Sequence, residues 1–448
     1  MKSSPRFTLA ILGADLVGVF LAFNILAVLR GIGSPLEPLL LPLAIPAALQ
    51  ILTLALIDGY SPRTDFLSVE YTSQHLIAMF AAIIGTLLFI FVFLPAGEML
   101  QQSRIVATFS FLVATPISLG VRRVLALRRT SIHQNRALVF VGDANSAATF
   151  KEECQRAGVT RKVINVSAHA GPDQEDFSSL VNAIEAGRLQ VEAIVLREST
   201  ADLPAGLPDR LVRLHFEGVP TYTLELFHER VWKKIPLYRI NQAWLFQGGF
   251  HLAREPLFER VKRVSDILLA LSVLLISAPF VVLAALAIRL EDGGPVFFRQ
   301  TRIGRHRAPF YLYKLRTMRT AVEGSRYTAK GDKRITRIGT LLRASRLDEL
   351  PQLWNVLKGD MSMIGPRAEW DVLVRDYERE IPCYHFRHLV RPGITGWAQI
   401  NYPYGAGIED TLRKLEYDLF YIRHYSFQLD ASIVLKTIHV MLFGKGSR

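Results

Sequence analysis

Four long apolar segments occupy the first part of the chain, and they limit its fold more than any other feature. They run from about Phe7 to Leu29, Leu36 to Ile57, Thr72 to Leu94 and Ile105 to Val121. A helix needs about 20 mostly apolar residues to cross the hydrocarbon core of a bilayer, and these segments are of that order. We therefore predict a four-helix transmembrane bundle within residues 1–130.

The basic residues around this bundle predict its orientation. Lys2 and Arg6 precede the first segment, and Arg122, Arg123, Arg128 and Arg129 follow the fourth. The intervening loops at 30–35 and 95–104 carry one Arg each. Because Lys and Arg concentrate in cytoplasmic flanks, we expect both ends of the bundle to be cytoplasmic. No small-residue cleavage site follows the first segment, so we expect an uncleaved anchor. Asp15, inside that segment, is expected to snorkel or to meet another helix rather than to act in function.

Residues 131–250 have a different pattern, in which short β-type runs alternate with helix-compatible stretches. The runs are Ala137 to Val141, Lys162 to Val166, Ala193 to Leu196 and Val219 to Tyr222. This alternation predicts a small parallel α/β domain of Rossmann-like type. The turn after the first run has Gly142 where a dinucleotide-binding fingerprint needs three glycines. We therefore predict a degenerate, structural or regulatory domain.

A fifth apolar segment runs from about Val264 to Ile288, and its length alone would suggest another crossing. Basic residues flank it on both sides: Lys262 and Arg263 before it, and Arg289 after it. A crossing would export the basic region that follows, against the positive-inside preference. Pro279 also disfavours a continuous helix. We predict a re-entrant membrane helix at about 264–288 that bends at Ser277 to Pro279, where the helix breaks, and returns to the same face.

The region after this segment is strongly basic. Residues 299–346 contain fourteen Lys or Arg but only Glu323 and Asp332, and the whole chain carries a net charge of +13. Such a surface suits anionic headgroups or an anionic substrate. Nucleic acid is the competing polyanion. We expect no nucleic-acid binding, because the sequence has no zinc-ligand spacing, RNP-like aromatic motif or clear helix-turn-helix.

Asp348 and Glu349 are adjacent carboxylates at the end of the basic region. Pro351 follows them and Gly359 comes later, so we predict a helix start or break at the pair and helix over 353–357. At a helix start, the free N–H groups would keep Asp348 ionised. Taken alone, such a pair is usually a cap or part of a solvated face.

Several motifs before and after this acid pair occur in the same order along the chain as in a known family. They are Gly294-Pro295-Val296-Phe297-Phe298-Arg299-Gln300, Tyr313-Lys314-Leu315-Arg316-Thr317-Met318, Leu347-Asp348-Glu349-Leu350-Pro351-Gln352-Leu353, Gly365-Pro366-Arg367, and Arg391-Pro392-Gly393-Ile394-Thr395-Gly396-Trp397-Ala398-Gln399. With them, the stretch from about Lys262 to the C-terminus resembles the catalytic domain of the bacterial sugar transferases, the monotopic phosphoglycosyl transferases. The N-terminal bundle and Rossmann-like domain resemble the large subclass of that family. Ala368 departs from the family pattern, which often has a second proline there.

The resemblance implies transfer of a sugar 1-phosphate from a nucleoside diphosphate sugar, expected to be a UDP-hexose, to polyprenyl phosphate, with release of the nucleoside monophosphate. It implies Asp348 as a covalent nucleophile toward phosphorus and as a ligand of Mg²⁺, with Glu349 as a helper. The candidate substrate-binding residues are Arg299, Arg302, Lys314, Arg316, Arg367 and Gln399.

The predicted fold class is therefore a membrane protein of α plus α/β type. It combines the bundle of 1–130, a Rossmann-like cytoplasmic domain at 131–250, and a mixed, mainly helical catalytic domain at 255–448 with its re-entrant helix. The resemblance implies the bacterial inner membrane, with the catalytic domain facing the cytoplasm. Its expected partners are the nucleoside diphosphate sugar, polyprenyl phosphate and membrane lipid, with a homodimer as a further possibility.

Two other functions were weighed. A membrane-tethered nucleotide-sugar epimerase or dehydratase would need a glycine fingerprint and a Tyr-x-x-x-Lys pair, and no such pair occurs in the chain. A scaffold or flippase would rest on the bundle alone and would leave the ordered motifs unexplained.

Overall fold

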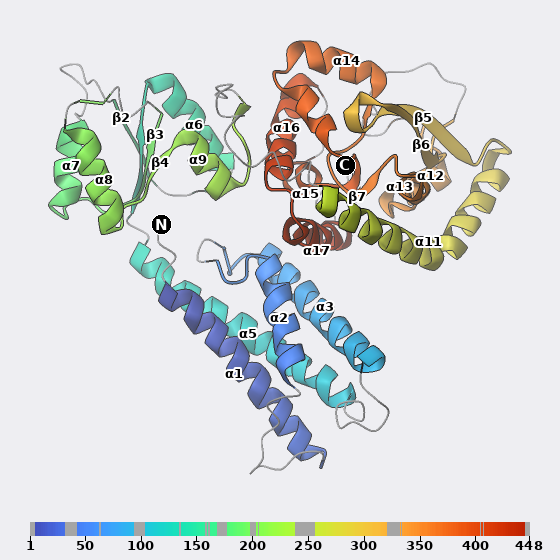
Figure 1. Cartoon of the computed structure of the whole chain (residues 1–448), viewed down its shortest axis with the longest axis horizontal. Helices are drawn as coiled ribbons and strands as arrows, with labels where there is room; N and C mark the ends of the chain where they lie inside the picture. Colours follow the sequence, from blue (N-terminus) through green and yellow to red (C-terminus); the bar gives the residue numbers. More distant parts are fainter. Residues whose placement is uncertain are drawn as a thin grey trace. The chain divides into compact units, whose positions relative to one another are not determined.

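A computed structural model shows the chain as two compact units, Met1–Trp232 and Lys233–Arg448, each described here by itself (Figure 1). The structure describes residues 5–31, 43–61, 64–93, 104–133, 136–156, 159, 162–167, 177–197, 203–204, 206–237, 256–319, 332, 334–403, 405 and 407–443. Its long apolar helices and mixed helical and sheet domains are those of a membrane protein of the α plus α/β class.

The first unit begins with the apolar helices α1 (Pro5–Leu29), α2 (Ala44–Leu56), α3 (Val69–Phe93) and α5 (Arg104–His133). Three of them contain stretches long and apolar enough to cross a membrane: Phe7–Leu29, Tyr71–Phe93 and Arg104–Arg128. Helix α2 has 13 residues and is shorter than the predicted segment. The start of that segment, residues 36–42, lies outside the described residues.

A buried ion pair joins α1 to α5. Asp15 on α1 receives two hydrogen bonds from the Arg122 guanidinium, at 2.9 and 2.7 Å, and both side chains are almost fully buried. Ser118 and Tyr60 also donate to the Asp15 carboxylate, at 2.7 and 2.8 Å. Buried charges need such partners, so the prediction that Asp15 meets another helix is confirmed.

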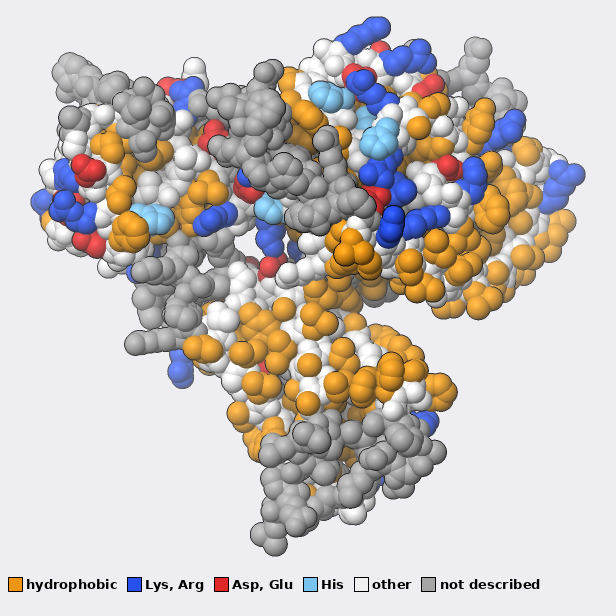
Figure 2. Space-filling view, viewed as in Figure 1, with side chains coloured by type: hydrophobic (Ala, Val, Ile, Leu, Met, Phe, Trp, Pro, Cys, Tyr) orange, Lys and Arg blue, Asp and Glu red, His pale blue; other side chains and the backbone are white. Residues whose placement is uncertain are grey.

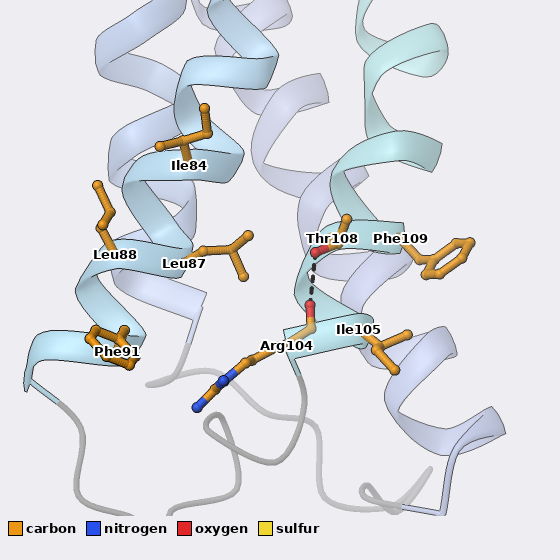
Figure 3. A pocket seen from close by; sticks show the side chains of 8 residues that line it. All are labelled: Ile84, Leu87, Leu88, Phe91, Arg104, Ile105, Thr108 and Phe109. Carbon is orange, nitrogen blue, oxygen red and sulfur yellow. Dashed lines mark hydrogen bonds between the residues drawn. The ribbon is translucent and has the colours of Figure 1, made fainter. Parts of the chain in front are cut away.

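A cavity of about 510 Å³ lies between α3 and α5 near one end of these helices (Figure 3). Its lining is mostly apolar and includes Ile84, Leu88 and Phe91 of α3 and Ile105 and Phe109 of α5. None of the predicted site residues lines this cavity, so the cavity does not identify the candidate active site.

The rest of the first unit is a parallel α/β domain whose four strands form where the sequence predicted them. They are β1 (Ala137–Val141), β2 (Val163–Val166), β3 (Val191–Leu196) and β4 (Thr221–Thr223), in the order β2-β1-β3-β4 with parallel pairing. Helices α6 (Ala144–Arg156) and α9 (Leu224–Phe227) pack on one face, while α7 (Phe177–Glu185) and α8 (Leu207–Glu217) pack on the other. A π-helical turn, η3 (His228–Trp232), follows α9.

The turn after β1 caps its own helix. Asp143 accepts a hydrogen bond from Ser146 N at 2.9 Å, and its carboxylate also pairs with Arg197 beyond β3. The chain's own carboxylate thus occupies the helix end where a dinucleotide fold would hold its pyrophosphate.

The first helix described in the second unit is α11 (Pro256–Asp292), which is long and apolar enough over Leu257–Asp292 to cross a membrane. The helix runs on through Pro279, so the predicted break is absent, whereas its ribbon is bent (Figure 1). A proline inside a helix is a common cause of such a bend. Hydrophobic side chains gather over α11 and over the N-terminal helices (Figure 2), and Leu275 is 79% exposed and Ile276 72% exposed.

The remaining elements of the second unit alternate short helices with short strands. They are β5 (Phe297–Ile303), η6 (Arg305–Arg307), β6 (Pro309–Leu315), α12 (Arg337–Ala344), η7 (Leu347–Glu349), α13 (Gln352–Lys358), β7 (Ser362–Ile364), β8 (Glu369–Trp370), α14 (Asp371–Glu380), η8 (Tyr384–Leu389), β9 (Gly393–Thr395), α15 (Trp397–Asn401), α16 (Ile408–Arg423) and α17 (Phe427–Phe443). One antiparallel sheet has the order β6-β5-β8, and β7 pairs with β9 in parallel. Residues 233–237 also pack in this unit, where Ile235 N donates to Glu416 O at 3.0 Å.

The inner face of α11 packs beneath the elements around the acid pair. Near its start, Ala270 lies in a cluster with Leu353 and Val356 of α13. Near its end, Ala284 and Ile288 lie in a cluster with Leu315 of β6 and Leu342 of α12.

Polar contacts hold both ends of α11 to the same group of elements. Arg263 donates to Val356 O and Leu357 O at the end of α13. The far end carries Glu291, which accepts hydrogen bonds from Arg337 N and Ile338 N at the start of α12, at 2.8 and 3.3 Å. Helix α11 therefore lies along the body that carries Asp348.

Candidate active site

Asp348 and Glu349 lie in the one-turn helix η7, between α12 and α13. Arg346 precedes them in the left-handed region, with φ of 59°, and turns the chain sharply out of α12. Pro351 then begins α13, and Gly359 ends it with φ of 96°. The predicted break at the acid pair and the short helix beyond it are confirmed.

Glu349 is the charged centre of this region. Its Oε1 lies 3.1 Å from Lys314 Nζ and 3.2 Å from Arg367 Nη2, and its side chain is 13% exposed. Burial alone would raise the pKa of Glu349, but Arg367, Lys314 and Arg346 together hold that pKa well below the usual glutamate range. Glu349 is therefore ionised and already paired with two cations.

Asp348 has a different environment. It is 8% exposed, and within the described part of the chain its carboxylate makes no hydrogen bond or ion pair. Burial raises the pKa of Asp348, and the nearby Lys314 opposes that rise. The shift is opposite in direction to the sequence-based expectation for a helix start, because burial outweighs the favourable charges. Among the residues that the structure describes, this carboxylate is therefore free of a hydrogen-bonded or ion-paired partner.

Lys314 reaches the pair from β6, where it lies opposite Phe298 of β5. Burial lowers the pKa of Lys314, and Glu349 counteracts this effect. Asn355 of α13 joins the two elements that carry these residues. Its side chain accepts from Tyr313 N at 3.2 Å and donates to Tyr311 O at 2.7 Å, so α13 is fastened to β6.

Arg367 reaches the pair from the segment after β7. The glycines of the two Gly-Pro-Arg and Arg-Pro-Gly motifs allow β7 and β9 to approach closely. A Cβ atom at Gly393 would lie 2.1 Å from Gly365 N, and one at Gly396 would lie 2.1 Å from Gly365 O. Substitution there would push the strands apart, and with them the backbone of Arg367, which bridges to Gly393.

The two predicted substrate-binding arginines of β5 make their identified contacts with residues other than Glu349. Arg299 is exposed on β5, with its guanidinium 5.7 Å from the centre of the Tyr311 ring. Arg302 donates to Gln300 Oε1 at 2.6 Å and to Ala368 O at 3.1 Å. For both residues, phosphate binding stays a prediction.

Arg316 and Gln399 each make a polar contact within the fold, although Gln399 Oε1 is buried without a hydrogen-bond partner among the described residues. Arg316 is buried and pairs with Asp292 at the end of α11. Gln399 Nε2 donates to Ile394 O at 3.1 Å. The nearby Trp397 is core rather than pocket, since it is 2% exposed and its indole donates to Lys233 O at 2.9 Å. The structure thus brings together Asp348, Glu349, Lys314 and Arg367, and not these residues.

Three contributing residues were missed in the sequence. Arg343 and Arg346 lie close enough to Asp348 to favour its ionised form, although the sequence marked them only as part of a basic run. No role was predicted for Asn355 from the sequence. A polar side chain among Leu353, Val356 and Leu357 was the available signal for a buried, hydrogen-bonded position.

Comparison with known proteins places this geometry in a context. The family model described as bacterial sugar transferase matches residues 257–444, which include α11 and every residue of the acid pair's surroundings. The chain is 38% identical over 271 residues to the UDP-N-acetylgalactosamine-undecaprenyl-phosphate N-acetylgalactosaminephosphotransferase of Aeromonas hydrophila. That alignment covers 60% of this chain and 63% of the relative, which is less than two thirds of the relative's length.

Two further relatives align over a shorter part of the chain. A UDP-glucose:undecaprenyl-phosphate glucose-1-phosphate transferase of Caulobacter vibrioides is 44% identical over 185 residues, covering 40% of this chain and 69% of the relative. The exopolysaccharide production protein PSS of Rhizobium leguminosarum is 42% identical over 186 residues, covering 40% of this chain and 93% of the relative.

Proposed function

Because this chain belongs to the bacterial sugar transferase family, we propose that it transfers a sugar 1-phosphate from a UDP-sugar to a polyprenyl phosphate such as undecaprenyl phosphate. The observation that carries the proposal is the contrast within the acid pair. Asp348 has no partner within the described residues, while the adjacent Glu349 holds two cations beside it.

In the first step, an oxygen of Asp348 attacks the β-phosphorus of the donor. A phosphorus–oxygen bond to the aspartate forms, the bond from the β-phosphorus to the bridging oxygen breaks, and UMP leaves. In the second step, an oxygen of the lipid phosphate attacks the same phosphorus. The bond to Asp348 breaks, which restores the carboxylate and yields the polyprenyl diphosphate sugar.

The attack of a carboxylate on a diphosphate is opposed by like charge, so fixed cations are required. Lys314 and Arg367 meet this need, because both are anchored on strands or strand ends and both face Glu349. Arginine binds phosphate oxygens through two parallel N–H groups, and preorganised cations act on the charge that develops in the transition state. Glu349 serves here as the residue that orients them.

The carboxylates also suit Mg²⁺ of the substrate-bound kind. Among the described residues no group of three or more His, Cys, Asp or Glu side chains forms a metal site. Mg²⁺ commonly takes one or two protein carboxylates and completes its shell with substrate phosphates and water, and Asp348 fits that donor set. When bound, Mg²⁺ would supply positive charge to the diphosphate.

We also propose that α11 is re-entrant and lies on the cytoplasmic side of the bacterial inner membrane. A crossing helix carries its two ends to opposite faces of about 30 Å of hydrocarbon. Here Arg263 bonds to α13 and Glu291 bonds to α12, and these two helices are separated only by residues 345–351. The packed inner face and the exposed apolar face of α11 support a helix embedded beneath the catalytic body.

The donor's sugar is left open by the relatives, whose names include both glucose and N-acetylgalactosamine. The test is to incubate the purified protein with Mg²⁺, undecaprenyl phosphate and single UDP-sugars, and to measure UMP release. We expect release to depend on both the lipid and one preferred sugar. Absence of release with every UDP-hexose tested would contradict the proposed function.

The covalent step is tested separately with donor labelled in the sugar and without lipid acceptor. We expect label to stay with the protein and to be discharged by undecaprenyl phosphate. The variant Asp348→Asn should incorporate no label. Retention of both incorporation and turnover in this variant would rule out Asp348 as the nucleophile.

A further inference from the structure

Arg387 is a buried cation that lies behind the site. It is 6% exposed and belongs to η8. Its Nη1 donates to the Tyr384 hydroxyl at 2.6 Å, and its Nη2 donates to Asp418 Oδ2 at 2.9 Å and to the carbonyl oxygen of Arg367 at 3.0 Å. One guanidinium therefore joins η8, α16 and the backbone of the arginine that faces Glu349.

The backbone of Arg367 is held on more than one side. Gly393 N donates to Pro366 O at 2.9 Å, and Gly365 N donates to Thr395 O at 2.9 Å. Arg387 adds the contact on the carbonyl of Arg367 itself, and the side chain of Arg367 then extends to Glu349 Oε1. A shift of that peptide would move the Arg367 guanidinium relative to Glu349.

We propose that Arg387 is a positioning residue, which sets the Arg367 guanidinium for the donor diphosphate through the Arg367 carbonyl. This inference rests on the proposed function and adds a residue from outside the acid pair's own surroundings. Arg387 does not touch the reacting atoms in this account. Its effect on the rate passes through Arg367.

The side chain needed at this position is specifically arginine. Its acceptors are a phenol oxygen, a carboxylate and a carbonyl on three different elements, and the planar guanidinium presents donors toward all of them. A lysine keeps the charge beside Asp418 but has a single nitrogen. Lysine therefore preserves charge balance while losing part of the geometry.

The test is a double-mutant cycle of Arg387→Gln and Arg367→Gln, read as the rate of label incorporation from the donor. We expect Arg387→Gln alone to lower the rate by about tenfold to a hundredfold, since small misplacements of binding groups have effects of that order. In the Arg367→Gln background the same change should lower the rate by less than about threefold, because coupled residues are not additive. Full additivity would overturn the inference, because a general loss of structure would multiply the two effects.

A matched control removes the same charge without touching the site. Arg375 on α14 is 71% exposed and contacts Asp371 at 3.6 Å, so Arg375→Gln should leave the rate unchanged. If Arg387→Gln does not fold, Arg387→Lys takes its place in the cycle, with an intact thermal midpoint and a smaller loss that again disappears with Arg367→Gln. An Arg387→Lys protein with the wild-type rate would contradict the inference. An inactive wild-type protein would instead overturn the proposed function, and this inference with it.

Discussion

Lys314 Nζ lies 3.1 Å from Glu349 Oε1, the same oxygen that Arg367 approaches at 3.2 Å. Both cations are thus paired with one carboxylate before a substrate arrives, and that carboxylate balances the charge of only one of them. An incoming diphosphate has to share them with Glu349. This relationship favours an orienting role for Glu349 over a proton-transfer role, because its pKa is held well below the range useful to a general base.

Glu349→Gln should reduce both stability and activity. The change leaves Lys314 and Arg367 without their common partner in a largely buried setting. We expect a loss of about 2 kcal/mol in stability, below the full cost of breaking a buried pair because Arg367 is partly solvated. Label incorporation should fall by about a hundredfold. Thermal unfolding in detergent and the labelling assay measure the two effects.

The control for this variant is Glu378→Gln, which removes a carboxylate paired with the more exposed Arg307 at 2.8 Å. It should change neither quantity measurably, since exposed pairs contribute little. Equal effects of the two substitutions would contradict a specific contribution of the Glu349 pairing to stability and label incorporation.

Asp348→Asn should abolish activity without lowering stability, in contrast to Glu349→Gln, which should reduce both. Burial disfavours the Asp348 carboxylate, which has no partner within the described residues, so a neutral amide of the same size removes a cost. We expect a thermal midpoint equal to or above that of the wild type, together with loss of label incorporation. A clear drop in the midpoint would mean that the carboxylate is a structural ligand rather than a nucleophile held in reserve.

Label incorporation should rise with pH through one titration that belongs to Asp348. Because burial raises its pKa, the reactive carboxylate forms only above the usual aspartate value of about 3.9. Glu349 should add no inflection in that range, since its cations keep it ionised. The initial labelling rate as a function of pH checks this, and a profile that is flat above pH 4 would contradict it.

The same two shifts predict opposite contributions to stability. Glu349, with a lowered pKa, contributes stability that is present above its unfolded value of about 4.3 and is lost as the pH falls toward the folded value. Asp348, with a raised pKa, contributes stability at low pH that is lost as the pH rises through its folded value. Unfolding midpoints of Asp348→Asn and Glu349→Gln, compared with the wild type across pH, separate the two terms.

The proposed re-entrant position of α11 predicts that both of its flanks lie on one side of the membrane. Single cysteines at Arg260 and Pro295, in a chain with Cys154→Ser and Cys383→Ser, should both be inaccessible to an impermeant maleimide added to spheroplasts. A cysteine at Gln101, in the loop predicted to be external, should react. Labelling at position 295 without labelling at 260 would mean that α11 crosses the membrane.

The local features of this chain were predictable from local signals. The four strands of the α/β domain follow from short apolar runs between turn residues, and the break at Asp348 follows from Pro351 and Gly359. Each of these features depends on the backbone preferences and the apolar pattern of its own short segment. The partner of Asp15 was predicted only as another helix, because the pairing with Arg122 spans 107 residues.

The assignment of basic residues to the site was less predictable. Charge density alone did not distinguish Lys314, which faces Glu349, from Arg316, which follows the end of β6 and pairs with Asp292. Which of these two residues faces Glu349 depends on where β6 ends. It also depends on which carboxylate, distant in the sequence, lies next to each side chain. Pro279 shows a similar limit, because its helix continues where the sequence suggested a break.

The two ends of α11 are hydrogen-bonded to the helices on either side of Asp348, one end to α13 and the other to α12. The apolar helix is therefore part of the frame of the active site rather than a detachable anchor. A truncated or grafted fragment that begins after residue 292 would contain Asp348, the proposed nucleophile, but would lack the helix that contacts α12 and α13. The smallest fragment that we expect to keep the proposed activity therefore includes α11, and with it a segment that lies in the membrane.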